Sequence, residues 1–278
     1  MSSSVVGTLF LVSTPIGNLG DMSHRAVEVL ASTALIVAED TRHSRRLLDH
    51  YGVSSPVSSY HEHNEAKETP RLVSRLLKGD SIALISDAGT PLISDPGSRL
   101  VEAALEAGVP VVPIPGASSV MAALVASGMP LDRFTFFGFL PRKGRERAAA
   151  IEDVVRSRIT TVVFEAANRV GATLTALSAA GAGERKAVVA RELTKQFEEF
   201  RRGTISELAR ACEDTAPRGE VVLVIAGAEK SETSEADLVA AARAARAEGL
   251  SARDITEHLI KDLGAPRNAA YRIAHGAE

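Results

Sequence analysis

The stretch Ile82-Ala-Leu-Ile-Ser-Asp-Ala-Gly-Thr-Pro91 decides the fold of this chain. It begins with four apolar residues, which predicts a short strand that is buried on both faces. The strand runs directly into a loop that contains a carboxylate, Asp87, and a glycine, Gly89. A carboxylate can bind amino or ribose hydroxyl groups, and a glycine lets the backbone approach a ligand closely. The stretch therefore predicts a small-molecule site at the end of a buried strand, and hence an enzyme.

Two further segments repeat this arrangement. Val109-Pro-Val-Val-Pro-Ile-Pro-Gly-Ala-Ser-Ser119 is a second apolar run that ends in a glycine turn and two hydroxyl residues. The loop Ser13-Thr-Pro-Ile-Gly-Asn-Leu-Gly-Asp21 follows a third apolar run. In open, mostly parallel sheets, ligands bind beyond the carboxyl ends of the strands. We therefore expect the three loops to converge on one edge of a sheet and to share one crevice.

Short β-branched runs alternate with amphipathic stretches, which is typical of a mostly parallel sheet covered by helices. In the first 130 residues we predict strands near 8–13, 34–38, 56–60, 81–86 and 109–114, and helices near 23–31, 43–51, 65–78, 97–107 and 118–127. The pattern then restarts, with strands near 134–139, 160–166, 186–192 and 220–226 and helices near 143–157, 168–179 and 204–214. The expected fold class is α/β, with α/β domains at 1–130 and 131–228 and a linker and helical domain at 229–278.

The C-terminal segment has the boundary signals of three helices after a polar linker, Ala228–Glu235. Ser251 can cap the second helix with Asp254 three residues later, Gly264 can close that helix, and Pro266 can open the third. The segment from Leu238 onward has six basic residues against five acidic ones. It resembles a helix-turn-helix bundle, and both a packing role and nucleic-acid docking remain open, the latter only if the basic residues cluster on one face.

Composition excludes several classes of protein. The chain has 278 residues, 45% of them hydrophobic, and is long enough for two domains. Its formal net charge of −3 argues against a uniformly basic nucleic-acid binder, so phosphate contacts must come from local clusters.

The lone Cys212 cannot form an intrachain disulfide and the start of the chain lacks a secretory signal, which indicates a cytoplasmic location. Residues 107–131 carry no charge, but prolines interrupt them, so we expect a strand, loop and helix rather than a membrane span.

Each candidate site residue also has a purely structural interpretation. Asp87 can cap its own turn instead of binding a ligand, although its repeated setting favours ligand binding. Ser118 and Ser119 follow Gly116 and open a helix whose free amides can hold a carboxylate, or they simply cap that helix.

Common cofactor motifs are missing from the sequence. No Gly-x-Gly-x-x-Gly fingerprint and no phosphate loop occur, so NAD, FAD and ATP are poor candidates. His61 and His63 lie two apart, which on a strand would place both on one face. No further ligands complete a metal site around them, so we predict no metal and assign them to polar surface or substrate contact.

Three basic clusters stand out, at 42–46, 142–147 and 201–202. Most runs of this kind are solvated helix faces or loops. The second cluster follows Gly138-Phe-Leu-Pro141, the predicted crossing between the two α/β domains, where a substrate would enter the crevice. That placement favours RNA contact by Arg142 and Lys143.

Seven ordered motifs carry a resemblance to a known family. They are Thr14-Pro-Ile-Gly-Asn-Leu-Gly-Asp21, Ala38-Glu-Asp-Thr-Arg42, Tyr60-His-Glu-His-Asn64, Ser86-Asp-Ala-Gly-Thr-Pro-Leu-Ile-Ser-Asp-Pro-Gly97, Pro115-Gly-Ala-Ser-Ser119, Gly138-Phe-Leu-Pro141 and Arg191-Glu-Leu-Thr-Lys195 with Glu198-Glu199. On these motifs nearly the whole chain resembles the ribosomal RNA methyltransferases of the tetrapyrrole-methylase-fold family of S-adenosylmethionine enzymes. The resemblance implies a cofactor cleft between the two α/β domains, a homodimer, and methylation of a cytidine ribose 2′-hydroxyl in the decoding region of 16S rRNA, as naked RNA or within the small ribosomal subunit.

The resemblance also implies the residues of the site. For S-adenosyl-L-methionine they are Pro15, Gly17, Asp87, Ala88, Gly89, Thr90, Ser94, Ser118, Ser119, Leu140, Glu165, Ala166 and Arg191. For the RNA substrate we expect Arg42, His61, His63, Arg142 and Lys143. Asn168 stands where relatives tend to carry a histidine in Glu-x-Pro-His-Arg, which removes that side chain as a proton acceptor.

A ribose hydroxyl that attacks a methyl group benefits from a base, and five residues in the expected cleft loops are candidates. They are Asp21, Asp40, His61, Lys195 and Glu198. Two other functions remain open. A tetrapyrrole or other small-molecule methyltransferase of the same fold is favoured by the acidic charge, and a non-enzymatic RNA-binding or ribosome-assembly factor by the helical segment.

Overall fold

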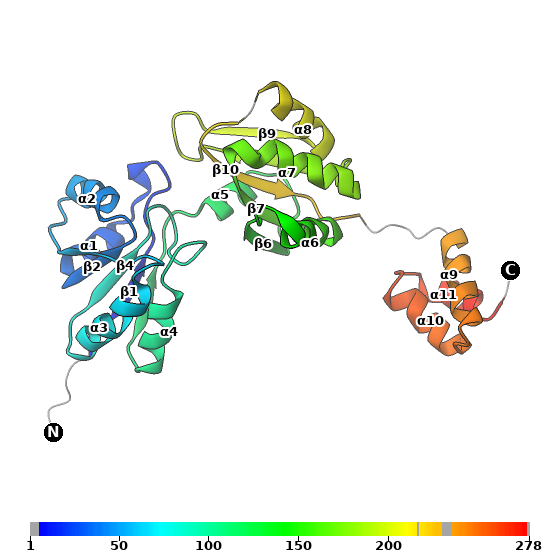
Figure 1. Cartoon of the computed structure of the whole chain (residues 1–278), viewed down its shortest axis with the longest axis horizontal. Helices are drawn as coiled ribbons and strands as arrows, with labels where there is room; N and C mark the ends of the chain where they lie inside the picture. Colours follow the sequence, from blue (N-terminus) through cyan, green and yellow to red (C-terminus); the bar gives the residue numbers. More distant parts are fainter. Residues whose placement is uncertain (1–5, 216, 230–234, 277–278) are drawn as a thin grey trace. The chain divides into compact units, whose positions relative to one another are not determined.

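The computed structural model describes residues 6–215, 217–229 and 235–276 (Figure 1). Two compact units make up the chain, Met1–Gly227 and Ala228–Glu278. The predicted linker at 228–235 lies mostly outside the described residues, as do residues 1–5, on which the expectation of no secretory signal rests. The first unit contains both sheets, and the predicted boundary near residue 130 therefore falls inside it.

The first sheet of unit 1 has five parallel strands in the order β3-β2-β4-β1-β5. They are β1 (Leu9–Val12), β2 (Leu35–Ala38), β3 (Val57–Ser59), β4 (Ile82–Ile85) and β5 (Val111–Ile114). The central strand β4 is buried along its whole length, as the opening stretch predicts. Because the strands are parallel, all five carboxyl ends lie at one edge of the sheet, and that edge carries the candidate loops.

Helices cover both faces of this sheet. They are α1 (His24–Ser32), α2 (Thr41–His50), α3 (Glu65–Leu77) and α4 (Ser98–Glu106). Successive residues of β4 point to opposite faces. Ile85 packs with Leu48 of α2 on the face that α1 also covers, and Leu84 packs with Leu76 of α3 on the face that α4 shares. Each leucine that is fully buried in this way contributes about 1.5–3 kcal/mol.

The second sheet of unit 1 is mixed, in the order β6-β7-β10-β8-β9, and only β6 and β7 are parallel. Its strands are β6 (Phe134–Phe139), β7 (Thr160–Ala166), β8 (Lys186–Arg191), β9 (Glu199–Thr204) and β10 (Glu220–Ile225). On one face lie α6 (Gly144–Arg156), α7 (Val170–Leu177) and α8 (Ile205–Asp214). The other face receives α5 (Ser119–Val125), whose Leu124 packs with Val222 and Val224. The helix that follows the first sheet thus packs on the second and ties the two together.

One strand was not predicted from the sequence. Glu199–Thr204 forms the edge strand β9, which pairs antiparallel with β8 and includes the basic pair Arg201 and Arg202. The prediction that 201–202 is a helix face or loop is therefore wrong. Arg201 forms an ion pair with Glu199 at 2.9 Å, and Arg202 lies over the Phe200 ring at 5.2 Å.

The described residues of unit 2 form three helices, α9 (Glu235–Ala247), α10 (Ala252–Lys261) and α11 (Arg267–Ala274), drawn in orange to red in Figure 1. Its predicted boundaries are confirmed. Ser251 accepts a hydrogen bond from the Asp254 amide at 3.2 Å, Gly264 has φ +68° beyond α10, and Pro266 immediately precedes α11. In the described part of the chain no helix is both long and apolar enough to cross a membrane.

Candidate functional site

The three loops predicted to converge do so at the carboxyl ends of β4, β1 and β5. Thr14 and Gly89 exchange two backbone hydrogen bonds of 2.9 and 3.1 Å. Thr90 Oγ1 accepts a hydrogen bond from Ser13 Oγ at 3.3 Å and donates one to the Ala117 carbonyl at 3.4 Å. The loops therefore form one connected wall.

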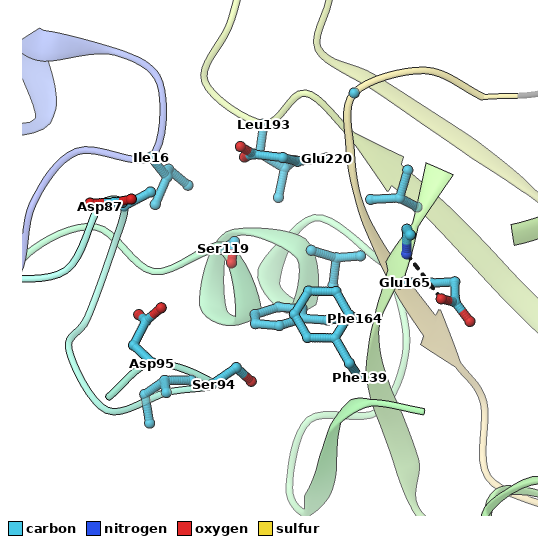
Figure 2. Close-up of a pocket in the computed structure, with 16 residues that line it drawn as sticks. Ile16, Asp87, Ser94, Asp95, Ser119, Phe139, Phe164, Glu165, Leu193 and Glu220 are labelled. Atoms are coloured by element: carbon cyan, nitrogen blue, oxygen red, sulfur yellow. Dashed lines mark hydrogen bonds between the residues drawn. The ribbon is translucent and has the colours of Figure 1, made fainter. Parts of the chain in front are cut away.

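A cavity of about 430 Å³ opens beside this wall (Figure 2). The residues that line it come from both sheets of unit 1: Ile16, Asp87, Ala88, Ile93, Ser94, Asp95, Ser119, Phe139, Phe164, Glu165, Ala166, Leu193, Gly219, Glu220, Val221 and Val222. Six of the predicted cofactor residues are among them: Asp87, Ala88, Ser94, Ser119, Glu165 and Ala166. Its volume lies in the range of small-molecule sites.

The other predicted cofactor residues lie around the cavity without lining it. Ser118 caps α5 by accepting a hydrogen bond from the Met121 amide at 3.4 Å, which is the structural alternative for that residue. Arg191 forms an ion pair with Glu199 at 2.5 Å. Pro15 and Leu140 are buried, and Gly89 and Thr90 join the loops. Gly17 has φ +144°, and a Cβ there would lie 2.4 Å from a carbon of the Lys195 side chain. The two sides of the unit therefore meet closely at Gly17.

Acidic side chains gather at one end of the cavity. Asp87 Oδ1 accepts a hydrogen bond from the Asp40 amide at 3.2 Å. Burial raises the pKa of Asp95 to about 6, and the nearby carboxylates of Glu39 and Asp87 contribute to the increase. Burial and Asp87 also raise the pKa of Glu39. This end of the cavity favours a ligand that carries positive charge.

Aromatic rings lie opposite the acidic residues. Figure 2 shows Asp87 and Asp95 on one side of the opening and the rings of Phe139 and Phe164 on the other. The two ring centroids are 5.4 Å apart, and Phe139 is 56% exposed although it is a large apolar residue. Exposed aromatic surface that faces a cavity is suited to a flat or apolar part of a ligand.

Glu165 supports the cavity wall through a buried network. Its carboxylate lies 3.2 Å from Arg169 and 4.0 Å from Arg147, accepts a hydrogen bond from Thr173 Oγ1 at 2.6 Å, and has no exposed surface. The side chain points away from Asp87 and Asp95 (Figure 2). Arg169 donates to the Leu140 carbonyl at 2.9 Å, so the network holds the chain as it leaves β6. The carboxylate of Glu165 therefore positions the cavity wall.

Strained backbone is concentrated on both sides of the cavity. Among the described residues, the non-glycine positions with left-handed φ are Leu92 (71°), Ser94 (69°), Glu192 (50°) and Thr194 (66°). Such conformations cost free energy and tend to persist at functional sites. Ser94 lines the cavity itself, and the residues between the strained pairs, Ile93 and Leu193, also line it.

The proposed proton acceptors have different environments. Asp40 caps α2, and the hydrogen bonds that it accepts from the His43 and Arg42 amides lower the pKa of its carboxyl. The pKa of Lys195 is raised: burial opposes its charge, but Glu192 and Glu220 at 3.0 and 3.2 Å more than offset that effect. A protonated lysine cannot accept a proton.

The other two acidic candidates lie at the surface. Glu198 accepts a hydrogen bond from the Thr194 amide at 2.7 Å, and Asp21 ends the short 3₁₀ helix Leu19–Asp21. None of the five candidates for the base, Asp21, Asp40, His61, Lys195 and Glu198, is among the lining residues of the cavity. A catalytic role for any of them stays a prediction.

The residues expected to hold substrate lie at the surface around the sheet edge. Arg42 is exposed at the start of α2, and Arg142 and Lys143 are exposed where the chain enters α6. His61 and His63 follow the predicted strand near 56–60 and lie in a turn: β3 ends at Ser59, and Asn64 holds the turn by accepting a hydrogen bond from the His61 amide at 2.9 Å. The two imidazole rings are nevertheless 6.0 Å apart.

Several lining residues were not identified from the sequence, chiefly Asp95, Phe139, Phe164 and Glu220. Asp95 lies in the motif that ends at Gly97, directly after the predicted cofactor residue Ser94, so a weak signal was present. Phe139 had a similar weak signal, since it lies in the motif Gly138-Phe-Leu-Pro141, whereas Phe164 had none, because apolar residues in a strand are usually part of the core.

The site can now be compared with known proteins. The family described as Tetrapyrrole (Corrin/Porphyrin) Methylases matches residues 8–209 of the chain. Two curated relatives bear the name "Ribosomal RNA small subunit methyltransferase I". One, from Synechocystis sp., is 45% identical over 97% of this chain and 98% of its own, and the other, from Mesorhizobium japonicum, is 46% identical over 95% of this chain and 90% of its own.

A solved structure shares the fold at much lower identity. It is uroporphyrin-III C-methyltransferase from Thermus thermophilus in complex with S-adenosylhomocysteine, with a TM-score of 0.57 and 17% identity over 79% of this chain and 97% of that chain. This likeness concerns the architecture alone.

Proposed function

The chain belongs to the tetrapyrrole methylase family, and on that premise we propose that it methylates ribosomal RNA of the small ribosomal subunit. It is an S-adenosylmethionine-dependent methyltransferase. RNA is proposed as the substrate because the chain is 45–46% identical, over nearly its full length, to relatives that bear the name of rRNA methyltransferases. The finer assignment, a cytidine ribose 2′-hydroxyl in the decoding region of 16S rRNA, belongs to the same proposal.

The cavity residues fit S-adenosylmethionine. Asp87 offers a carboxylate to its positive charges, while Ile16, Phe164 and Val221 offer apolar surface. When bound, S-adenosylmethionine supplies an electrophilic methyl group. The protein aligns the ribose hydroxyl with that group and shields the site from water, and alignment alone can provide much of the acceleration.

Asp95 is the carboxylate best suited to accept the proton of the substrate hydroxyl. It lines the cavity, and its carboxyl has a pKa of about 6. A general base is most effective when its pKa lies close to the working pH. At pH 7.5 it is ionised and free to accept a proton. Asp40 and Lys195 are less suited to act as the base, because the pKa of Asp40 is lowered and the pKa of Lys195 is raised.

Arg42, Arg142 and Lys143 hold the RNA backbone in this scheme. All three are exposed cations near loops that border the cavity, and phosphate contacts of this kind set register without reading sequence.

The proposal also includes a homodimer in the cytoplasm. The exposed apolar side chains Met121 (49%) and Val125 (68%) of α5 support an interface with a second copy.

The function is tested by transfer of labelled methyl from S-adenosylmethionine to small subunits and to protein-free 16S rRNA that lack their modifications. We expect one methyl group on a cytidine ribose, located by mass mapping of nuclease fragments. Transfer to a tetrapyrrole without transfer to RNA would instead make the chain a small-molecule methyltransferase. RNA binding without any binding of S-adenosylmethionine would make it a non-enzymatic factor.

Asp87→Asn is expected to weaken S-adenosylmethionine binding about ten- to a hundred-fold, because hydrogen bonds to a charged group contribute about 1.5–3 kcal/mol. Asn keeps the size of the side chain and an oxygen that can accept from the Asp40 amide. Calorimetric titration of the pure protein provides the affinity. The matched control is Asp49→Asn, an exposed aspartate in the last turn of α2, which should bind normally. Equal affinities in both variants would remove Asp87 from the cofactor site.

A further inference from the structure

Unit 2 carries a groove of about 510 Å³ along α10 and α11. Its lining residues are Arg253, Thr256, Glu257, Ile260, Lys261, Arg267, Tyr271 and His275. Those on α10 follow the i, i+3, i+4, i+7, i+8 spacing of one helix face, and those on α11 are spaced by four. The groove is therefore built from one face of each helix.

The core of unit 2 uses other faces of the same helices. Ile255 and Leu259 of α10 pack with Ala270 and Ile273 of α11 and have at most 6% of their surface exposed. Ile260 packs against this core as well, but the other groove residues lie outside it, so their identity is free to serve another purpose.

The groove has an excess of positive charge. Lys261 forms an ion pair with Glu257, which leaves the guanidinium groups of Arg253 and Arg267 without an ion-pair partner among the described residues. Neighbouring carboxylates are already engaged: Asp254 accepts from Ser251 Oγ at 2.6 Å, and Asp262 lies 2.6 Å from His258 Nδ1. Among the described residues the groove therefore presents two arginines that form no ion pair, although the sequence of unit 2 has nine acidic residues against seven basic ones.

An aromatic platform lies beside these cations. Tyr271 is 60% exposed, and its ring stacks on that of His275 with a centroid distance of 4.0 Å and an interplanar angle of 26°. A tyrosine exposed to this extent contributes little to the stability of the protein core. Exposed rings next to arginines are the usual means by which proteins hold unpaired nucleotides, through stacking and phosphate contacts.

We propose that the groove between α10 and α11 binds single-stranded RNA, with Arg253 and Arg267 on phosphates and one unpaired base stacked on Tyr271. This inference rests on the proposed function, because it gives the RNA substrate a second contact on the enzyme. Charge complementarity and the stacked rings favour RNA over a protein partner. The groove holds the RNA while the cavity of unit 1 performs the transfer.

The test measures binding of the full-length protein to a fluorescent single-stranded fragment of unmodified 16S rRNA at several salt concentrations. Arg253→Ala with Arg267→Ala should reduce the magnitude of the slope of log K against log salt by about 1.4, since each single-strand phosphate contact contributes about 0.7. Tyr271→Ala should weaken binding about five- to 150-fold with little change in that slope, and Tyr271→Phe should restore it. Arg243→Ala, an exposed arginine of α9 outside the groove, is the charge control.

Failure of this inference is distinct from failure of the proposed function. The groove variants should keep the wild-type affinity for S-adenosylmethionine and the wild-type kcat at saturating RNA, with only KM raised. If the wild-type chain methylates rRNA and the groove variants bind the protein-free fragment normally, the inference is overturned. Normal binding to that fragment with weakened binding to intact subunits would assign the groove to a ribosomal protein, which also overturns it. If the wild-type chain transfers no methyl to RNA, the proposed function fails instead.

Discussion

We expect Asp95→Asn to lower kcat at pH 7.5 by about a hundred-fold or more, because general acid–base catalysis contributes about 10²–10⁴-fold. The carboxylate lines the cavity, and burial together with Glu39 and Asp87 raises its pKa to about 6. Only the ionised form accepts a proton, so the kcat of the wild-type enzyme should rise with pH and reach a plateau by about pH 7. A bound cationic ligand favours the ionised form, which moves the midpoint to pH 6 or below. The variant should have a flat profile.

Stability provides an independent check on the same residue. Since the folded-state pKa of Asp95 lies above its ordinary value, the folded protein binds more protons than the unfolded chain between about pH 4 and pH 6. The contribution of Asp95 to stability therefore falls as pH rises through this window. Asp95→Asn should lose activity and yet be more stable than the wild type at pH 7.5 in urea unfolding. A variant that loses both would indicate a merely structural role.

Glu39→Gln is the matched control for Asp95. Glu39 is an acidic neighbour whose pKa is also raised by burial, but it does not line the cavity. Its removal should leave kcat within a few-fold of the wild-type value. It should also lower the pKa of Asp95, because the repulsive negative charge of Glu39 is no longer present. Equal losses of activity in the two variants would contradict the assignment of Asp95 as the base.

The sequence predicts the first sheet well, because a strand that is buried on both faces is a continuous apolar run. Ile82–Ile85 has this pattern, and the loops after β1, β4 and β5 could then be placed at one edge. The edge strand Glu199–Thr204 has no such run. It contains Arg201, which pairs with Glu199, and Arg202, which is exposed and donates to the Ala126 carbonyl at 2.6 Å. Charged residues are frequent on edge strands, where they prevent aggregation.

The candidate site was predictable only in part. Residues directly after strands could be located, and Asp87, Ala88 and Ser94 are among those that line the cavity. The raised pKa of Asp95 depends instead on its burial and, to a smaller extent, on Glu39, which lies 56 positions earlier in the chain (95 − 39) and approaches only in the folded state. Tertiary approach of this kind leaves no local pattern in the sequence, and pKa shifts follow from it.

Glu165→Ala is expected to lower the free energy of unfolding by about 3–5 kcal/mol, the typical result when one partner of a buried ion pair is removed. Arg147 and Arg169 would both remain, with only 17% and 22% of their side chains exposed and no carboxylate between them. Glu165→Gln keeps the shape and the hydrogen bond to Thr173 and should cost less. Urea unfolding followed by circular dichroism measures the difference.

The chain itself supplies a matched control for Glu165. Glu152 and Arg156 form another glutamate–arginine pair with the same i, i+4 spacing, at 3.1 Å, but their side chains are 59% and 76% exposed. Exposed pairs of this kind contribute about 0.3–0.5 kcal/mol, so Glu152→Ala should change stability by no more than that. Similar losses in Glu165→Ala and Glu152→Ala would mean that burial does not determine the contribution of the pair.

A double-mutant cycle separates the ion pair from its consequence for the site. If Glu165→Ala lowers the free energy of unfolding because two arginines are left without a carboxylate, the same substitution should lower it less when Arg169→Ala is already present. The effects of substitutions at residues in contact are not additive. Arg169 also holds the Leu140 and Pro141 carbonyls at 2.9 and 3.2 Å, so its loss releases the segment that leads from β6 into α6. Both single variants should therefore weaken S-adenosylmethionine binding under conditions in which the protein is still fully folded. Loss of stability without loss of binding would confine the network to the core, whereas loss of both places the cavity wall under its control.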